Sequence, residues 1–345
     1  MLVEEARRLA VDWVRVHADG PLPVVGAFFT GSTVEAQNGD ELAPTSDVDV
    51  TVVLDGPVPA KPGKLDHGGA LVEVTYLPWD ALADPEVVAR TSFLAPSFAR
   101  DTVISDPEGR LRALREAVAP LVWRRDVLLD RCRFVLDRMT AEPQPTSSWA
   151  GAVTGWLFPA SLSTNVVLVA ARRNPTVRLR YLRARAALAE HGMAERYPPL
   201  LDQLGCRAAP AALVAQHLDT MTAAFDAAAA GPPGEFFFAA DLTSVARPVA
   251  VDGAHGLIAA GDHREAVFWL MATFARCVQA LDATGSPDAA VHGETFALAV
   301  ADLLGLATRD DLARRRAAVL ATVPALLSTA EEIIDRSGGH PASAG

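Results

Sequence analysis

Runs of residues with the character of β-strands occur only before residue 80, and this placement constrains the fold more than any other feature. Three such runs, VVGAFF at 24–29, DVDVTVVL at 47–54 and ALVEVTYL at 70–77, are rich in β-branched or aromatic residues and lie between turn-forming segments. That pattern is typical of short strands. Apolar residues at helical spacing over 2–17 predict an amphipathic helix before them. The first part of the chain is therefore expected to mix strands and helices in one small domain.

From about residue 110 the strand pattern gives way to long stretches rich in Ala, Leu and Arg with helical periodicity. Helices are expected over roughly 120–140, 148–172, 176–191, 208–230, 262–283, 290–305 and 309–335. A chain of 345 residues exceeds one ordinary core. We therefore predict an α+β fold with a first domain over 1–115, a larger all-helical domain over 116–336 and a disordered tail over 337–345.

The composition bears on partners and location. The formal net charge of -11 argues against long nucleic acid as a partner and is compatible with a cationic ligand. Three cysteines lie far apart without a CxxC motif, which favours a reducing cytoplasm. The N-terminal segment lacks the pattern of a signal peptide, and no stretch offers about 18 uncharged apolar residues. We expect a cytoplasmic protein that does not bind a membrane.

The second strand carries two carboxylates inside a run of valines. Because successive side chains of a strand point to opposite faces, Asp47 and Asp49 share one face, and Val48, Val50 and Val52 share the other. Two neighbouring carboxylates repel each other, and burying them unpaired is costly. A divalent cation held by both is the expected compensation, and magnesium prefers a few carboxylates together with oxygens of a substrate phosphate.

Glu73 offers a third carboxylate on the third strand, where it alternates with Val72 and Val74. If the second and third strands are neighbours, the three acids converge. Two acids that bridge a pair of ions suit in-line displacement at phosphorus. The third acid can ligate one ion or accept the proton of an attacking hydroxyl. Asp66 and Asp80 are alternatives for this role, but both lie in turn-like segments.

A Gly-Ser pair follows the first strand. Glycine at Gly31 lets the backbone approach a phosphate closely. Ser32 stands where the strand is expected to turn into a short helix, so its hydroxyl and nearby N–H groups can hold anionic oxygens. The pair predicts a phosphate-binding turn beside the acids.

These motifs together resemble the DNA polymerase β-like nucleotidyltransferase superfamily, whose mark is a Gly-Ser pair after a strand, Asp-x-Asp on the next strand and one carboxylate on a later strand. The layout also resembles the antibiotic (aminoglycoside) nucleotidyltransferases, which join such a domain to a helical one. The resemblance covers about residues 20–80. Fourteen residues separate Ser32 from Asp47, where those enzymes usually have about ten. The segment EAQNGDELA at 35–43 therefore reads as an enlarged surface loop.

The resemblance implies a mixed sheet, two Mg²⁺ ions and transfer of a nucleoside monophosphate, by default AMP from ATP, onto a hydroxyl with release of pyrophosphate. The acceptor would be a small molecule, cationic by analogy to the antibiotic enzymes, selected by the helical domain. Asp47, Asp49 and Glu73 would be the catalytic and metal-binding residues, with Glu73 as the base. Gly31 and Ser32 would bind the nucleotide. Dimerisation is common among the look-alikes.

Two alternatives stay open. The same fold could adenylylate a protein or activate a carboxylate in biosynthesis. A non-catalytic NTP-binding regulator, or an antitoxin-like protein, belongs to a different class. A mere binder has no need to keep all three acids, which favours the enzyme.

The helical part offers weaker candidates for substrate contact. Trp149 is the tryptophan best placed to face a cleft, and Asp241, with Glu235, flanks the aromatic run EFFFAAD. The arginines of AARRNPTVRLRYLRAR, at 172–185, are expected mainly on a solvated helix face, with one or two reaching the phosphates. Asp262 and Glu265 fit a capping box at the start of a helix.

Overall fold

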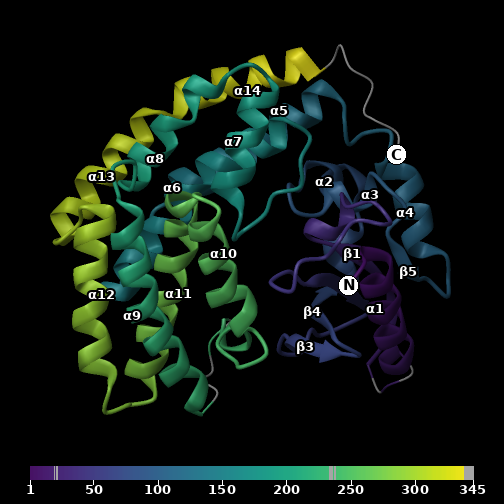
Figure 1. Ribbon diagram of the computed structural model, residues 1–345. Helices are drawn as coiled ribbons and strands as arrows, with labels where there is room; N and C mark the ends of the chain where they lie inside the picture. Colours follow the sequence, from purple (N-terminus) through teal and green to yellow (C-terminus); the bar gives the residue numbers. More distant parts are fainter. Residues whose placement is uncertain (19, 21, 233–235, 237, 338–345) are drawn as a thin grey trace. The chain divides into compact units, whose positions relative to one another are not determined.

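The chain folds into two compact units, as seen in a computed structural model (Figure 1). The structure describes residues 1–18, 20, 22–232, 236 and 238–337. The first unit contains Met1–Phe134, Val169–Thr176 and the residues from Ile334, and the second contains Val135–Leu168 and Val177–Ile333. Strands lie in the first unit and the second is helical, which confirms the predicted α+β class.

The first unit is built on a mixed sheet of five strands in the order β3-β4-β2-β1-β5 (Figure 1). The strands are β1 (Val24–Thr30), β2 (Val48–Leu54), β3 (Gly63–His67), β4 (Ala70–Pro78) and β5 (Val103–Ser105). β2 and β4 run parallel, whereas the pairs β1/β2, β1/β5 and β3/β4 are antiparallel. The three predicted strands are confirmed as β1, β2 and β4.

Helices cover both faces of this sheet because its strands are apolar on both. Helix α1 (Val3–Ala18) packs through Ala6, Ala10 and Trp13 on the face that carries the alternating valines of β2. On the other face, Phe28 and Val53 pack against α2 (Pro85–Arg90), α3 (Ala95–Phe98) and α4 (Arg110–Val118). The core on this second face reaches Val53 but not Asp49, which lies at the opposite end of β2. The sheet thereby leaves a polar corner at the start of β2.

Two strands, β3 and β5, were not predicted from the sequence. β3 lies in the segment GPVPAKPGKLDHGG at 56–69, whose prolines and glycines are typical of a connection between strands. Gly68 and Gly69, both at positive φ, close the hairpin between β3 and β4, and Asp66 accepts a hydrogen bond of 3.2 Å from the Gly69 N–H. β5 spans only three residues at the other edge. Edge strands this short carry too few residues to show alternation.

Two Asp-Pro-Glu motifs, at 84–86 and 106–108, have the sequence of a helix start, but only the first of them begins a helix. Asp84 caps α2 by accepting a hydrogen bond of 2.9 Å from the Glu86 N–H, with Pro85 in the first turn. After Asp106 the chain makes a turn first, and α4 begins only at Arg110. The Asp106 carboxylate still accepts from the Leu111 and Arg112 N–H groups.

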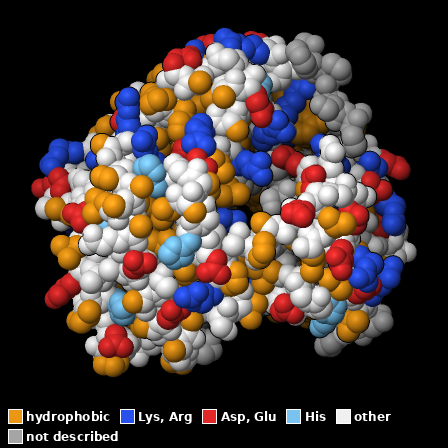
Figure 2. All heavy atoms as spheres, viewed as in Figure 1, with side chains coloured by type: hydrophobic (Ala, Val, Ile, Leu, Met, Phe, Trp, Pro, Cys, Tyr) orange, Lys and Arg blue, Asp and Glu red, His pale blue; other side chains and the backbone are white. Residues whose placement is uncertain are grey.

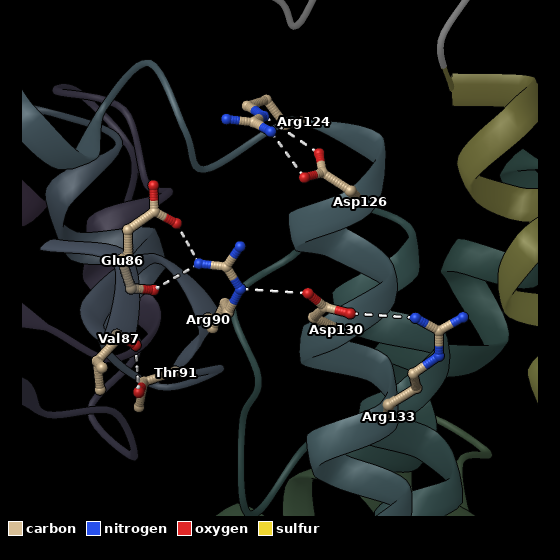
Figure 3. A network of polar contacts seen from close by, with 8 residues as sticks. All are labelled: Glu86, Val87, Arg90, Thr91, Arg124, Asp126, Asp130 and Arg133. Carbon is tan, nitrogen blue, oxygen red and sulfur yellow. Dashed lines mark hydrogen bonds and ion pairs between the residues drawn. The ribbon is translucent and has the colours of Figure 1, made fainter.

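Helix α5 (Arg125–Thr140) is tied to α2 by an ion-pair network (Figure 3). Arg90, at the end of α2, contacts Glu86 in its own helix and Asp130 of α5 at 3.2 Å. Asp130 in turn pairs with Arg133 one turn further along α5, at 3.1 Å. These groups are half-exposed, so the network positions the two helices more than it stabilises them.

The second unit is an assembly of helices that surround the apolar helix α11. Its main helices are α6 (Trp149–Ala170), α7 (Arg180–Glu190), α8 (Pro198–Leu204), α9 (Ala211–Ala230), α10 (Gly253–Ala259), α11 (His263–Ala283), α12 (Ala289–Leu304), α13 (Arg309–Ala321) and α14 (Val323–Ser337), whose last residues belong to the first unit. Residues Glu265–Val278 of α11 are buried without exception. The predicted tail lies outside the described residues from 338 onward, and its first residue, Ser337, ends α14.

Two arginines expected on a solvated helix face are instead structural. Arg180 is buried, donates 3.0 Å and 2.5 Å hydrogen bonds to the Val177 carbonyl and the Ser161 hydroxyl, and stacks its guanidinium over the Phe268 ring. Arg185 pairs with both Asp262 and Glu265 at 2.7 Å. The expectation of a capping box at these two acids is therefore wrong, because no side-chain cap bond forms at Asp262.

Replacing Arg185 with methionine is expected to lower the free energy of unfolding by about 2–3 kcal/mol, because the buried Glu265 carboxylate loses its cation. Of the donors among the described residues, it keeps the Tyr197 hydroxyl, at 2.8 Å. Urea unfolding measures this. Arg207→Met, which breaks an exposed pair with Asp202, is the control and is expected to cost less than about 1 kcal/mol. Equal losses in the two variants would contradict the structural role of Arg185.

Three helical stretches are long and apolar enough to cross a membrane: Trp149–Ala170, His263–Ala283 and Ala289–Ala321. Their most apolar windows are 61%, 78% and 33% buried within the protein. α6 holds 22 residues without one charge, which corrects the expectation that no stretch offers about 18 uncharged apolar residues. On the face of the molecule drawn in Figure 2, hydrophobic side chains are interspersed with charged ones. The cytoplasmic location stays a prediction.

Candidate metal centre

Three carboxylates meet at the polar corner of the sheet in the first unit. Asp49 of β2 lies directly opposite Glu73 of the parallel neighbour β4, so the two side chains leave the same face. Asp47, two residues before Asp49, follows the same alternation just ahead of β2. One oxygen of each acid lies within 4.8 Å of the others. The convergence expected from the sequence follows from the strand order, which places β2 beside β4.

A lysine completes the cluster. Lys64 of β3 lies opposite Glu73 in the antiparallel β3/β4 pair, so it joins the same row across the sheet. Its ammonium contacts Asp47 Oδ2 at 2.5 Å and also pairs with Glu73. Lys61, just before the strand, pairs with Glu73 as well. The sequence analysis missed Lys64 because it missed β3, whose five residues are too few to show alternation.

The donor set fits a metal ion. Carboxylate oxygens are the ligands that Mg²⁺ and Mn²⁺ prefer. The protein already holds a cation, the Lys64 ammonium, against two of the three acids, which shows that this corner is electrostatically suited to positive charge. The Asp47–Asp49–Glu73 cluster can therefore hold a metal ion. Asp66 and Asp80, the alternatives for the third acid, are both exposed and lie outside the cluster.

The surroundings shift the pKa values of the three acids in different directions. Burial, together with the nearby charges of Asp47 and Glu73, raises the pKa of Asp49 well above its usual range. Burial likewise raises the pKa of Asp47 despite the Lys64 ammonium. For Glu73 burial acts in the same direction, but Lys64 and Lys61 outweigh it and lower the pKa to about 2. Of the three acids, Asp49 has the negative charge that nearby cations compensate least. A bound metal ion would therefore stabilise the ionised form of Asp49 most.

The turn after β1 brings backbone against Asp49. Gly31 has φ 67° and ψ -158°, a conformation almost restricted to glycine. A Cβ at this position would overlap the Asp49 carboxylate. Ser32 is exposed and begins η1 (Ser32–Val34), so the short helix expected there is a single 3₁₀ turn and not an α-helix. Any phosphate contact at Ser32 would depend on its hydroxyl and on this turn.

A distant segment fixes that turn. Residues 169–176, which comprise the last two residues of α6 and the segment after it, pack in the first unit. There Asn174 donates a 2.5 Å hydrogen bond from Nδ2 to the Gly31 carbonyl, and its backbone N–H donates to the Glu35 carboxylate. Arg172, in the same segment, has φ 58°, which is unusual for a residue with a side chain. The sequence analysis had no signal for Asn174, because 143 residues separate it from Gly31.

Asn174→Ala is expected to loosen the Gly31–Ser32 turn. Loss of one hydrogen bond to the Gly31 carbonyl should cost about 1 kcal/mol of unfolding free energy. Hydrogen exchange of the backbone amides of 33–36 should quicken, which mass spectrometry of peptic fragments would detect. Asn38→Ala removes an exposed contact with Arg7 in the neighbouring loop and serves as the control. Unchanged exchange in 33–36 for Asn174→Ala would contradict this role.

The enlarged loop that sets the chain apart from the look-alikes is anchored on α1. The Val3 N–H donates to the Asp40 carbonyl at 2.9 Å, and Leu2 and Glu41 form an isolated β-bridge. Arg7 donates to the carbonyls of Thr33 and Ala36. The extra residues thus tie the Gly31–Ser32 turn to the first helix.

The candidates in the helical unit have different surroundings. Trp149 lines a surface pocket of about 470 Å³ together with Asp282 and Glu294. The Asp241 carboxylate is engaged by Arg276 at 2.9 Å, so a cationic ligand would have to compete with that guanidinium. Glu235 lies outside the described residues.

Comparisons with known proteins find no match for this chain. No family model matches the chain, and no curated protein matches it significantly. The geometry of the acidic corner therefore carries the functional interpretation.

Proposed function

We propose that this protein is a magnesium-dependent nucleotidyltransferase of the DNA polymerase β-like type. The observation that carries the proposal is the convergence of Asp47, Asp49 and Glu73 at the corner where Gly31 closes against Asp49. The five-stranded mixed sheet is consistent with that type. A bound pair of divalent ions would supply charge neutralisation and an in-line arrangement at the α-phosphorus.

The chain's own residues have distinct tasks in this proposal. Asp47 and Asp49 hold the metal. Glu73 completes the metal site and accepts the proton of the attacking hydroxyl. The acceptor oxygen forms a bond to the α-phosphorus of the NTP while the bond to the β-phosphate oxygen breaks, and pyrophosphate leaves. Gly31 and Ser32 would bind the phosphates, and most of the rate enhancement would come from positioning and electrostatics.

The two lysines bear on the role of Glu73. A carboxylate held ionised by Lys64 and Lys61 is ready to receive a proton but is a weak base. Proton transfer to Glu73 therefore requires that the lysine contacts loosen when metal and substrate bind.

The donor is ATP by default, and a small hydroxylated, cationic acceptor is our proposal by analogy to the antibiotic enzymes. The helical unit would select it, with Trp149 and Asp241 as first candidates for contact. A cytoplasmic location and the absence of long nucleic acid as partner remain part of the proposal.

Mass spectrometry of reactions with each NTP, Mg²⁺ and panels of aminoglycosides, other hydroxylated amines, sugars and amino acids tests this function. The expected product is an acceptor heavier by one nucleoside monophosphate, with one pyrophosphate released per transfer. Self-labelling of the chain or labelling of added protein would instead favour protein adenylylation. NTP binding without any transfer would favour a non-catalytic regulator.

A further inference from the structure

We propose that Lys64 is the resident counter-cation of the acidic corner, and that its ammonium sets how tightly the site takes a divalent cation. The inference rests on the metal-binding part of the proposed function and is independent of the nucleotide and the acceptor. It assigns Lys64 as a positioning residue.

The first support is the place of the ammonium. The Lys64 side chain is only 8% exposed, and it bridges Asp47, at 2.5 Å, and Glu73. An ammonium has three donors and no lone pair, so it cannot share in ligating an ion. A metal that uses these oxygens of Asp47 and Glu73 must therefore take them from Lys64.

The second support is the pattern of compensation within the cluster. Among the described residues, no hydrogen bond or ion pair reaches the Asp49 carboxylate, although it belongs to the same cluster as the two acids that Lys64 engages. One ammonium neutralises only one of three negative charges. The corner stays attractive to a cation, but less attractive than three free carboxylates would be.

The neighbouring lysine provides a contrast. Lys61 also carries a positive charge against Glu73, but its side chain is 33% exposed and it makes no ion pair with Asp47. Solvent screens such a pair much more than a buried one. Lys61 should therefore have a smaller influence on metal affinity, which makes it a matched control.

The arrangement has a consequence for the metal-free protein. Three converging carboxylates would repel each other without a cation, and Lys64 holds two of them in place until an ion arrives. When a divalent cation occupies the corner, the ammonium vacates Asp47 and Glu73, which the flexible four-carbon stem of lysine permits.

Titration of the full chain with Mn²⁺ at pH 8, with free Mn²⁺ read by electron paramagnetic resonance, tests the inference. Lys64→Met is expected to bind Mn²⁺ about 10- to 1,000-fold more tightly than the unaltered protein, because a charge at this range shifts the proton affinity of a carboxylate by about 1–3 pKa units. Lys61→Met should show a smaller gain. Lys64→Arg keeps the charge and should stay close to the unaltered protein.

If Lys64→Met folds poorly without metal, the melting temperature of a second variant provides the test. Lys64→Gln retains a donor to the acids, and its melting temperature should rise more on addition of Mn²⁺ than that of the unaltered protein. Unchanged or weaker Mn²⁺ binding in Lys64→Met and Lys64→Gln would overturn the role of Lys64. Failure of every acceptor panel would overturn the proposed transfer reaction and leave these metal affinities untouched.

Discussion

Asp49→Ala is expected to lower the affinity for Mn²⁺ by at least about 100-fold and to abolish nucleotidyl transfer. Asp49 has no cationic partner among the described residues, whereas Asp47 and Glu73 both pair with Lys64, so Asp49 is the ligand most free to bind an ion. Altering even an outer-shell partner of a metal ligand commonly costs about 10- to 100-fold. Electron paramagnetic resonance with Mn²⁺ and the transfer assay measure the two effects.

The same change should raise thermal stability in metal-free buffer. The pKa of Asp49 is raised in the folded protein by burial and by Asp47 and Glu73, so folding becomes less favourable once the pH exceeds the ordinary pKa at which this carboxyl ionises in the unfolded chain. Removal of the carboxylate relieves this at neutral pH, and the melting temperature in EDTA should increase. Asp66→Ala, which removes an exposed acid of the neighbouring β3–β4 hairpin, is the control for the Mn²⁺ measurement. Full Mn²⁺ affinity in Asp49→Ala would refute the metal assignment.

Gly31→Ala is expected to damage both the stability of the first unit and its metal site. The backbone at Gly31 adopts a conformation that costs other residues about 1–3 kcal/mol. The added Cβ would also overlap the Asp49 carboxylate and push it out of the cluster. Stability and Mn²⁺ affinity should therefore both fall, as chemical unfolding and the Mn²⁺ titration would show.

Gly39→Ala separates the two causes. Gly39 also has a positive φ, of 90°, but an added Cβ there would meet nothing within 4 Å. This variant should lose stability, by about 1–2 kcal/mol, and keep the Mn²⁺ affinity of the unaltered protein. If Gly31→Ala also keeps that affinity, the close approach of Gly31 to Asp49 has no role in the metal site.

The fold was predictable to the extent that local pattern reports it. Alternating valines identified β2, and helical periodicity identified α1 and the long helices of the second unit. Strand β3 was not predicted, because a five-residue edge strand among prolines and glycines has no periodicity to detect. The prediction of a capping box at Asp262 and Glu265 was wrong for a different reason. Their sequence fits a capping box, but Arg185 of α7 offers both carboxylates a stronger partner.

The sequence by itself determined which face of each strand carries the acids. Alternation along β2 and β4 places Asp47, Asp49 and Glu73 opposite the valines, and a glycine before Ser32 allows the turn that approaches them. Tertiary structure decided what surrounds these acids. Pairing of β3 with β4 adds Lys64 to the row, and the segment after α6 places Asn174 on the Gly31 carbonyl. Such contacts depend on strand order and chain return, which side-chain periodicity along a single element does not encode.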